Sequence, residues 1–168
     1  MKRIVVTGGN KGIGLAIVKR LLKEFSDTYI FLGSRNRKRG EIAIEQTIIE
    51  LGESVKSRVK VLDLDVTSDK SIQDAVVSVQ KLLGETGESL YGLVNNAGGF
   101  EEGMSGQNII DLNMYGVYRV TEAFLPLIEE KGKIYHQLTR LRFFITKVNF
   151  VPLESIELAN DFIELIFF

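Results

Sequence analysis

A glycine-rich segment near the start of the chain has the composition of a phosphate-binding loop. Residues 7–14 read Thr-Gly-Gly-Asn-Lys-Gly-Ile-Gly and lie between an apolar run and an amphipathic stretch. Glycine lets the backbone turn sharply and lets a diphosphate approach the amides at a helix N-terminus, where the helix dipole favours an anion. A P-loop is excluded, because no Gly-Lys-Ser/Thr occurs. The segment predicts a dinucleotide site, with a glycine-rich turn without ligand as the alternative.

Polar residues also follow two later apolar runs. Residues 63–67 read Asp-Leu-Asp-Val-Thr, and residues 95–98 read Asn-Asn-Ala-Gly. Because open α/β sheets bind ligands at the carboxyl ends of their strands, we expect the second segment to line a cofactor. The alternative is that Asn95 and Asn96 only satisfy backbone groups of a turn. Asn113 lies within a predicted helix, where an isolated asparagine often faces water.

The elements that must position these residues alternate between strand and helix patterns. This alternation predicts right-handed βαβ units, and hence a doubly wound parallel sheet in a three-layer α/β/α arrangement. Gly132 is expected to end the last helix. The predicted strands cover 3–7, 28–32, 58–66, 90–95 and 133–137, and the predicted helices cover 12–25, a region up to about 51, 68–83 and 107–130.

Taken together, these segments resemble the short-chain dehydrogenase/reductase family, and most of all its carbonyl reductases. Residues 7–14 resemble the Thr-Gly-x-x-x-Gly-x-Gly cofactor motif, 63–67 the adenine-contacting segment and 95–98 the Asn-Asn-Ala-Gly motif. Asn113 matches the helix asparagine of the catalytic tetrad. The resemblance covers about residues 1–134 and implies a Rossmann-like fold with hydride transfer from NADPH to a carbonyl. The cofactor-binding residues that it implies are Gly8, Asn10, Lys11, Gly12, Ile13, Gly14, Arg35, Asp65, Val66, Asn95, Ala97 and Gly98.

The end of the second predicted strand bears on which nucleotide binds. Folds that prefer NAD usually have an acidic residue there, which accepts hydrogen bonds from the ribose hydroxyls. This chain has a basic run over 34–39 instead, with no carboxylate before Glu41. Arg35, joined by Lys11, would suit the 2′-phosphate of NADP. The alternative, a solvated basic turn before the next helix, is the expectation for residues 37–39.

The tyrosine and lysine that the family uses as an acid pair are missing. An unperturbed tyrosine exchanges protons poorly at neutral pH unless a cation lies near it. Tyr115 with Arg119 is the basic match at this spacing, but it lies on the helix of Asn113. Thr139 falls near the position of the family's serine. A catalytically inactive nucleotide-binding remnant, a cofactor sensor or a structural subunit is therefore the competing hypothesis. The residues four positions after Tyr29, Tyr91, Tyr115, Tyr118 and Tyr135 are Gly33, Asn95, Arg119, Glu122 and Thr139.

Composition restricts the possible classes of protein further. The 168 residues carry a net charge of −1, no cysteine and one histidine. Disulfides and cysteine-based zinc sites are excluded, and no charge imbalance favours nucleic acid or a membrane surface. We expect a cytoplasmic protein without a signal peptide or membrane span. The family resemblance implies a nicotinamide dinucleotide and a small carbonyl substrate as its partners.

The chain changes character near Gly132. All 16 glycines lie at or before this residue, whereas six of the ten phenylalanines lie in 143–168. We therefore predict a dinucleotide-binding domain over 1–134 and an atypical apolar tail over 135–168. The family's second half is missing from this chain, so we expect a truncated sheet. Unpaired sheet edges and large apolar patches drive association. We therefore expect 141–151 to dock on the open side of the sheet and the protein to self-associate there.

Overall fold

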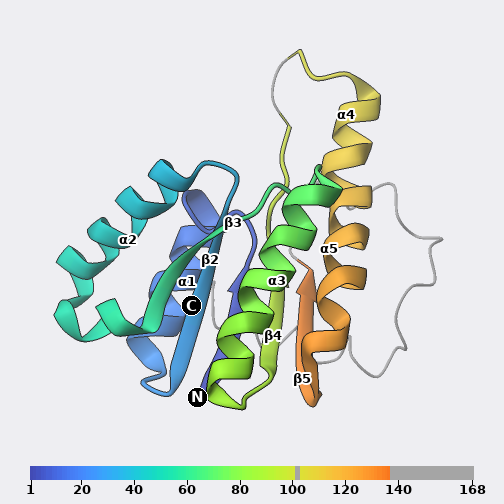
Figure 1. Cartoon of the computed structure of the whole chain (residues 1–168). Coiled ribbons are helices and arrows are strands. Elements are labelled where there is room, and N and C mark those ends of the chain that lie inside the picture. The colour runs from blue at the N-terminus through green and yellow to red at the C-terminus, as the bar shows by residue number, and fades with distance from the viewer. Residues whose placement is uncertain (101–102, 137–168) are drawn as a thin grey trace.

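The computed structural model describes residues 1–100 and 103–136. Within them, parallel strands form one sheet in the order β3-β2-β1-β4-β5 (Figure 1). The order reverses between β1 and β4, so the carboxyl ends of these strands flank the point at which open α/β sheets bind ligands. The strands are β1 (Lys2–Val6), β2 (Thr28–Ser34), β3 (Val59–Asp63), β4 (Leu90–Asn95) and β5 (Ile128–His136).

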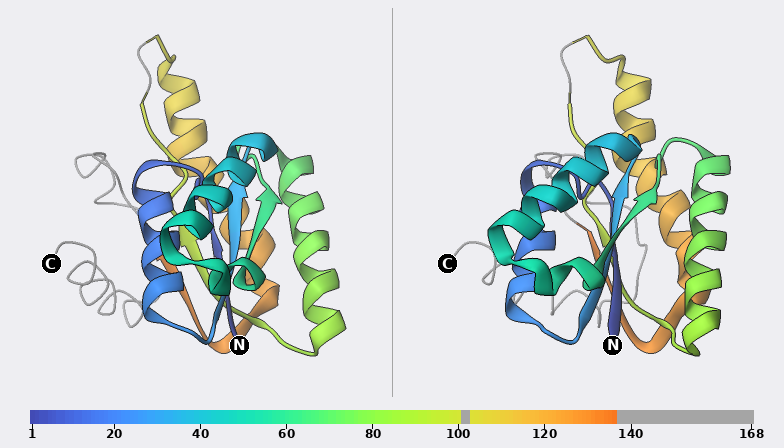
Figure 2. Two further views of the ribbon diagram at one scale, coloured as in Figure 1. Left: turned by 90° about the vertical axis from the view of Figure 1, so that its left-hand side faces the viewer. Right: turned by 60° about the vertical axis from the view of Figure 1, so that its left-hand side comes forward.

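Helices cover both faces of this sheet (Figure 2). On one face lie α1 (Gly12–Glu24) and α2 (Arg37–Leu51), and on the other α3 (Asp69–Thr86) and α5 (Gly116–Phe124). A 3₁₀ turn, η1 (Glu53–Arg58), leads from α2 into β3. The predicted three-layer, doubly wound α/β architecture is confirmed.

The strands contribute side chains to two separate apolar cores, because successive side chains of a strand point to opposite faces. Ile4 and Val6 of β1 pack with α1 and α2, while Val5 between them packs with α3 and α5. Val5, Val6 and Phe124 are fully buried. Packing in these two cores fixes where the strands end relative to one another. It thereby fixes the positions of the loops at their carboxyl ends.

The prediction of one helix over 107–130 is wrong in its extent. The structure has α4 (Gly106–Ile110), a π-helical turn η2 (Asp111–Tyr115), α5, a 3₁₀ turn η3 (Leu125–Leu127) and then β5. Pro126 lies in η3 and lacks the N–H that a continuing helix needs. Gly132 lies inside β5, where a Cβ atom would approach Ile128 and the Glu129 carbonyl closer than 3.0 Å.

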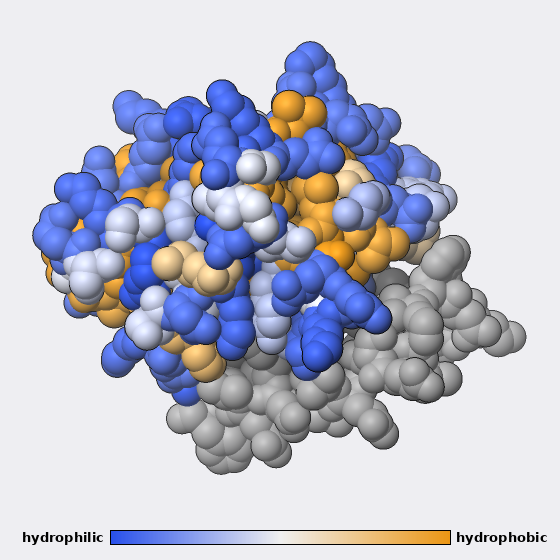
Figure 3. Space-filling view, turned by 60° about the horizontal axis from the view of Figure 1, so that its bottom comes forward, coloured by the Kyte–Doolittle hydropathy of each residue, from blue (hydrophilic) through white to orange (hydrophobic). Residues whose placement is uncertain are grey.

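The surface seen from the lower side of the molecule is mostly polar (Figure 3). Apolar residues gather mainly in the right half of that view. No helix among the described residues is long and apolar enough to cross a membrane. Thr139, the expected docking of 141–151 and the self-association drawn from it lie outside the described residues.

Candidate functional site

The glycine loop joins β1 to α1 at the switch point of the sheet. Gly8 and Gly12 have φ angles of 64° and 56°, in the left-handed region that favours glycine. Position 14 requires a residue without a side chain for a different reason. A Cβ atom there would lie closer than 3.0 Å to the Gly8 carbonyl and to the Asn96 side chain. Glycines 8, 12 and 14 therefore allow a turn that approaches both α1 and the loop after β4.

Thr7 and Asn96 hold the two loops of the switch point together. The Asn96 Nδ2 atom donates to the Thr7 carbonyl at 2.9 Å and to the Gly8 carbonyl at 3.3 Å. In return, the Thr7 hydroxyl accepts from the backbone amides of Asn96 and Ala97 at 3.0 and 2.8 Å. Asn96 thus satisfies backbone groups, as the alternative interpretation from sequence had it. Thr7 and Asn96 lie in the segments 7–14 and 95–98 that the sequence predicts to line the cofactor, but the hydrogen bonds between the two segments were not predicted.

The N-terminus of α1 carries no side-chain cap. Lys11 occupies the capping position without a side-chain hydrogen bond, and the first turn contains no acidic residue. Lys11, Gly12 and Ile13 are exposed there, and Asn10 is partly exposed. An uncapped helix start carries partial positive charge and free backbone donors. Here it adjoins the space beside Gly14 that a Cβ atom would fill. These features fit the diphosphate of a dinucleotide.

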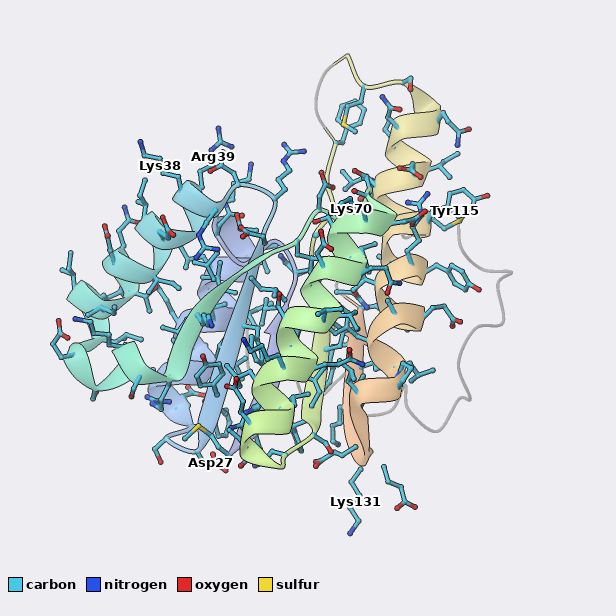
Figure 4. The ribbon with its side chains drawn as sticks, viewed as in Figure 1. Asp27, Lys38, Arg39, Lys70, Tyr115 and Lys131 are labelled. Atoms are coloured by element: carbon cyan, nitrogen blue, oxygen red, sulfur yellow. The ribbon has the colours of Figure 1, made fainter. Side chains whose placement is uncertain are left out.

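The basic residues of the turn after β2 differ in whether their charge is paired with a carboxylate. Arg35 is exposed and forms no hydrogen bond or ion pair with any described residue. Arg37 instead donates to Asp63 Oδ2 at 2.8 Å and to Glu41 Oε1 at 2.9 Å. The hydrogen bond to Asp63 is the main reason that the pKa of Arg37 lies above its ordinary value. Lys38, labelled in Figure 4, projects outward from the start of α2.

Asp65 and Val66 form the turn that follows β3. The Asp65 carboxylate accepts from the Thr67 amide at 2.9 Å and from its hydroxyl at 2.7 Å. Val66 is buried beneath Gly116, whose missing side chain leaves room for it. This turn lies at the same carboxyl edge as the glycine loop, with Asp65 partly exposed.

Asn95 points into the protein rather than toward the loops. It is 2% exposed, and its amide donates to the Thr121 hydroxyl at 3.0 Å and to His136 Nδ1 at 3.3 Å. Because Nδ1 accepts in this arrangement, neutral His136 carries its proton on Nε2. Desolvation of the ring lowers the pKa of His136 below the usual 6.5, although the residue as a whole is exposed. A cofactor contact of Asn95 would have to come from its backbone.

Asn113 fixes the loop that follows Asn95-Asn96-Ala97-Gly98. Its Oδ1 accepts from the Gly99 amide at 2.8 Å, and its Nδ2 donates to the carbonyls of Gly99 and Ile109 at 2.9 and 2.8 Å. The acceptor of the last bond, the Ile109 carbonyl, lies four residues before Asn113. At this point the helix widens into the π-helical turn η2. The side chain therefore positions the loop at the carboxyl end of β4.

A shallow groove of about 370 Å³ lies between α3 and α5, away from the glycine loop. In it, Arg119 donates to Asp111 at 2.6 Å and lies 3.4 Å from Asp69, and the bond to Asp111 raises the pKa of Arg119. Its guanidinium lies 6.0 Å from the ring centroid of Tyr115. Figure 4 shows Tyr115 extending from the helix on the side away from β1–β4. The Tyr115–Arg119 pair is thus not directed at the candidate cofactor edge.

The parallel sheet, the glycine loop at its switch point and the uncapped start of α1 define a dinucleotide-binding α/β protein of the dehydrogenase type. A family model described as short chain dehydrogenase matches residues 2–135. The chain therefore belongs to the short-chain dehydrogenase family, as its motifs predicted. This family binds nicotinamide cofactors.

The chain is similar to dehydrogenases and reductases that are considerably longer. It is 28% identical over 141 residues to the mitochondrial D-beta-hydroxybutyrate dehydrogenase of Bos taurus, covering 79% of this chain and 39% of that protein. It is 34% identical over 138 residues to carbonyl reductase (NADPH) 1 of Homo sapiens, covering 77% and 46%. The NADPH-bound carbonyl reductase from chicken fatty liver superposes with a TM-score of 0.60 at 26% identity, covering 76% and 48%. The chain spans less than half the length of each of these proteins.

Proposed function

We propose that this chain binds NADPH in preference to NADH, and that it is the cofactor-binding part of a reductase acting on small carbonyl compounds. The observation that carries the proposal is Arg35, an exposed guanidinium at the carboxyl end of β2 with no partner among the described residues. No acidic residue competes with it in the basic run 34–39. A free guanidinium there suits a phosphate on the adenosine ribose.

Each predicted cofactor residue has a distinct task in this proposal. The backbone of Gly8, Gly12, Ile13 and Gly14, with the neighbouring Asn10, receives the diphosphate at the start of α1. Two cations, Arg35 and Lys11, hold the 2′-phosphate. A second group of residues borders the adenine and nicotinamide halves: Asp65, Val66, Asn95, Ala97 and Gly98.

The cofactor would supply a hydride to the carbonyl carbon. In this chain Asn113 acts as a positioning residue, because its side chain holds Gly99 and with it the end of β4. Protonation of the alkoxide needs a general acid, and no tyrosine of the sequence is followed by lysine at the fourth position. The cytoplasmic location belongs to the same proposal and rests on composition.

A second function, nucleotide binding without catalysis, is favoured by this missing acid. A chain that binds the dinucleotide but turns over no carbonyl would act as a cofactor sensor or as a subunit of a larger assembly. The two functions share the cofactor site and differ only in carbonyl turnover, so one set of binding measurements tests their common part.

Titration calorimetry of the full chain with NADPH and NADH tests the proposal. We expect tighter binding of NADPH, and Arg35→Ala should remove most of the difference while leaving NADH binding unchanged. Arg39→Ala is the matched control, because it removes a cation from the same turn. Its affinity for both nucleotides should equal that of the parent. Equal affinity of the parent chain for NADPH and NADH would overturn the assignment of the 2′-phosphate.

A further inference from the structure

The basic turn beside the candidate 2′-phosphate site contains one cation whose charge is already balanced. Arg37 binds two carboxylates, Asp63 at 2.8 Å and Glu41 at 2.9 Å, whereas Arg35 is free of such partners in the described part of the chain. In the sheet register Ser34 of β2 lies opposite Asp63 of β3. Neighbouring strands lie about 4.8 Å apart, so Asp63 lies beside the residue that directly precedes Arg35.

Folding stability alone does not account for this ion pair. The Arg37 and Asp63 side chains are 60% and 57% exposed, and exposed ion pairs contribute little to stability. The start of α2 is held against β3 independently. Gly40 packs so closely on Val61 that a Cβ atom would not fit. The other effect of this ion pair is electrostatic. It cancels negative charge at the edge of the sheet where the phosphate would lie.

We propose that Arg37 helps to set the preference for a phosphorylated dinucleotide by neutralising Asp63 and Glu41 next to Arg35. This inference rests on the proposed function. A 2′-phosphate carries close to two negative charges, so two unbalanced carboxylates would repel it more than they repel a ribose with free hydroxyls. Arg37 does not need to touch the nucleotide for this effect. It is a positioning residue that acts through the two carboxylates.

Calorimetry with NADPH and NADH measures the effect in the full chain. Arg37→Gln should weaken NADPH binding about threefold to tenfold and NADH binding less than about twofold, with a smaller effect at high salt. Adding Asp63→Asn to Arg37→Gln should return NADPH affinity to within about twofold of the parent. Lys38→Gln is the matched control, because it removes the same charge from the next residue. In that background Asp63→Asn should change NADPH affinity no more than it does in the parent.

Thermal unfolding of each variant shows whether it folds like the parent, and Asp63→Asn alone gives a second test, since it should leave NADPH binding equal or tighter. A purely structural role of Arg37 predicts equal losses for NADPH and NADH and no recovery with Asp63→Asn; that result overturns the inference. A parent that prefers NADPH while Arg37→Gln changes nothing overturns this inference alone. A parent that binds neither nucleotide overturns the proposed function and this inference with it.

Discussion

Replacing Gly14 with alanine tests the close packing between the glycine loop and the loop after β4. The new Cβ atom would lie closer than 3.0 Å to the Gly8 carbonyl oxygen and to Asn96 Nδ2, which is itself bonded to the Thr7 carbonyl at 2.9 Å. The Gly8 carbonyl is backbone, and Asn96 Nδ2 can move only by giving up its hydrogen bonds to the glycine loop, so the loop must move. Overpacking costs about 1–3 kcal/mol, and alanine's better helix propensity returns somewhat less than about 1 kcal/mol. We expect the free energy of unfolding to fall by about 1–2 kcal/mol.

Urea unfolding and calorimetry of the full chain measure both consequences of Gly14→Ala. Gly84→Ala in α3 is the matched control, because nothing lies within 4 Å of its Cβ position. That change should stabilise the chain by about 0.5–1 kcal/mol and leave NADPH affinity unchanged. Gly14→Ala should weaken NADPH at least about tenfold, or about 1.4 kcal/mol, because the diphosphate loop is displaced. A Gly14→Ala chain with the stability and the NADPH affinity of the parent would show that the loop accepts a Cβ atom at this position without moving.

Three further predictions concern Asn113, His136 and turnover. Asn113→Ala leaves the Gly99 amide and carbonyl unpaired, so we expect a loss of about 1–3 kcal/mol and faster exchange of the Gly99 amide. Asn108→Ala should change neither quantity. The lowered pKa of His136 means that its contribution to stability is present above pH 6.5 and is lost as the pH falls toward the folded-state pKa. NMR titration of this imidazole should give a value below 6.5, and His136→Gln should remove that part of the pH dependence; a pKa at or above 6.5 would contradict the burial argument. With NADPH and an aromatic aldehyde, turnover should fall about 10²–10⁴-fold below the common range of about 1–10³ per second, and turnover within that range would show that a general acid has been missed.

The architecture could be predicted from the sequence because each element carries a complete local signal. The alternation of β-branched runs with helical spacing predicted the parallel sheet, and β4 has the predicted bounds, Leu90–Asn95. The apolar pattern after Asn113 misled the prediction, because helical spacing continues past Pro126 into residues that form β5. Strand pairing with β4, a contact between distant residues, decides the conformation of residues 128–136.

The contacts within the site were less predictable than the residues that make them. Asn96 and Thr7 are 89 residues apart, and only the pairing of β1 with β4 brings them together. Asn95 and Asn96 are neighbours of the same type, yet one faces the glycine loop and the other Thr121 and His136. Motif spacing identified the loop, while the direction of each amide depends on the pleat of β4.

In the proposed complex a phosphorylated dinucleotide lies along the glycine loop with its 2′-phosphate on Arg35. An NMR titration of the ¹⁵N-labelled chain with each nucleotide detects both of these contacts. We expect NADPH and NADH both to shift the amides of residues 8–14, and NADPH alone to shift the side-chain Nε–H of Arg35. Shifts confined to the groove between α3 and α5 would contradict binding along the glycine loop, and an Arg35 response that is equal for the two nucleotides would contradict a 2′-phosphate on Arg35.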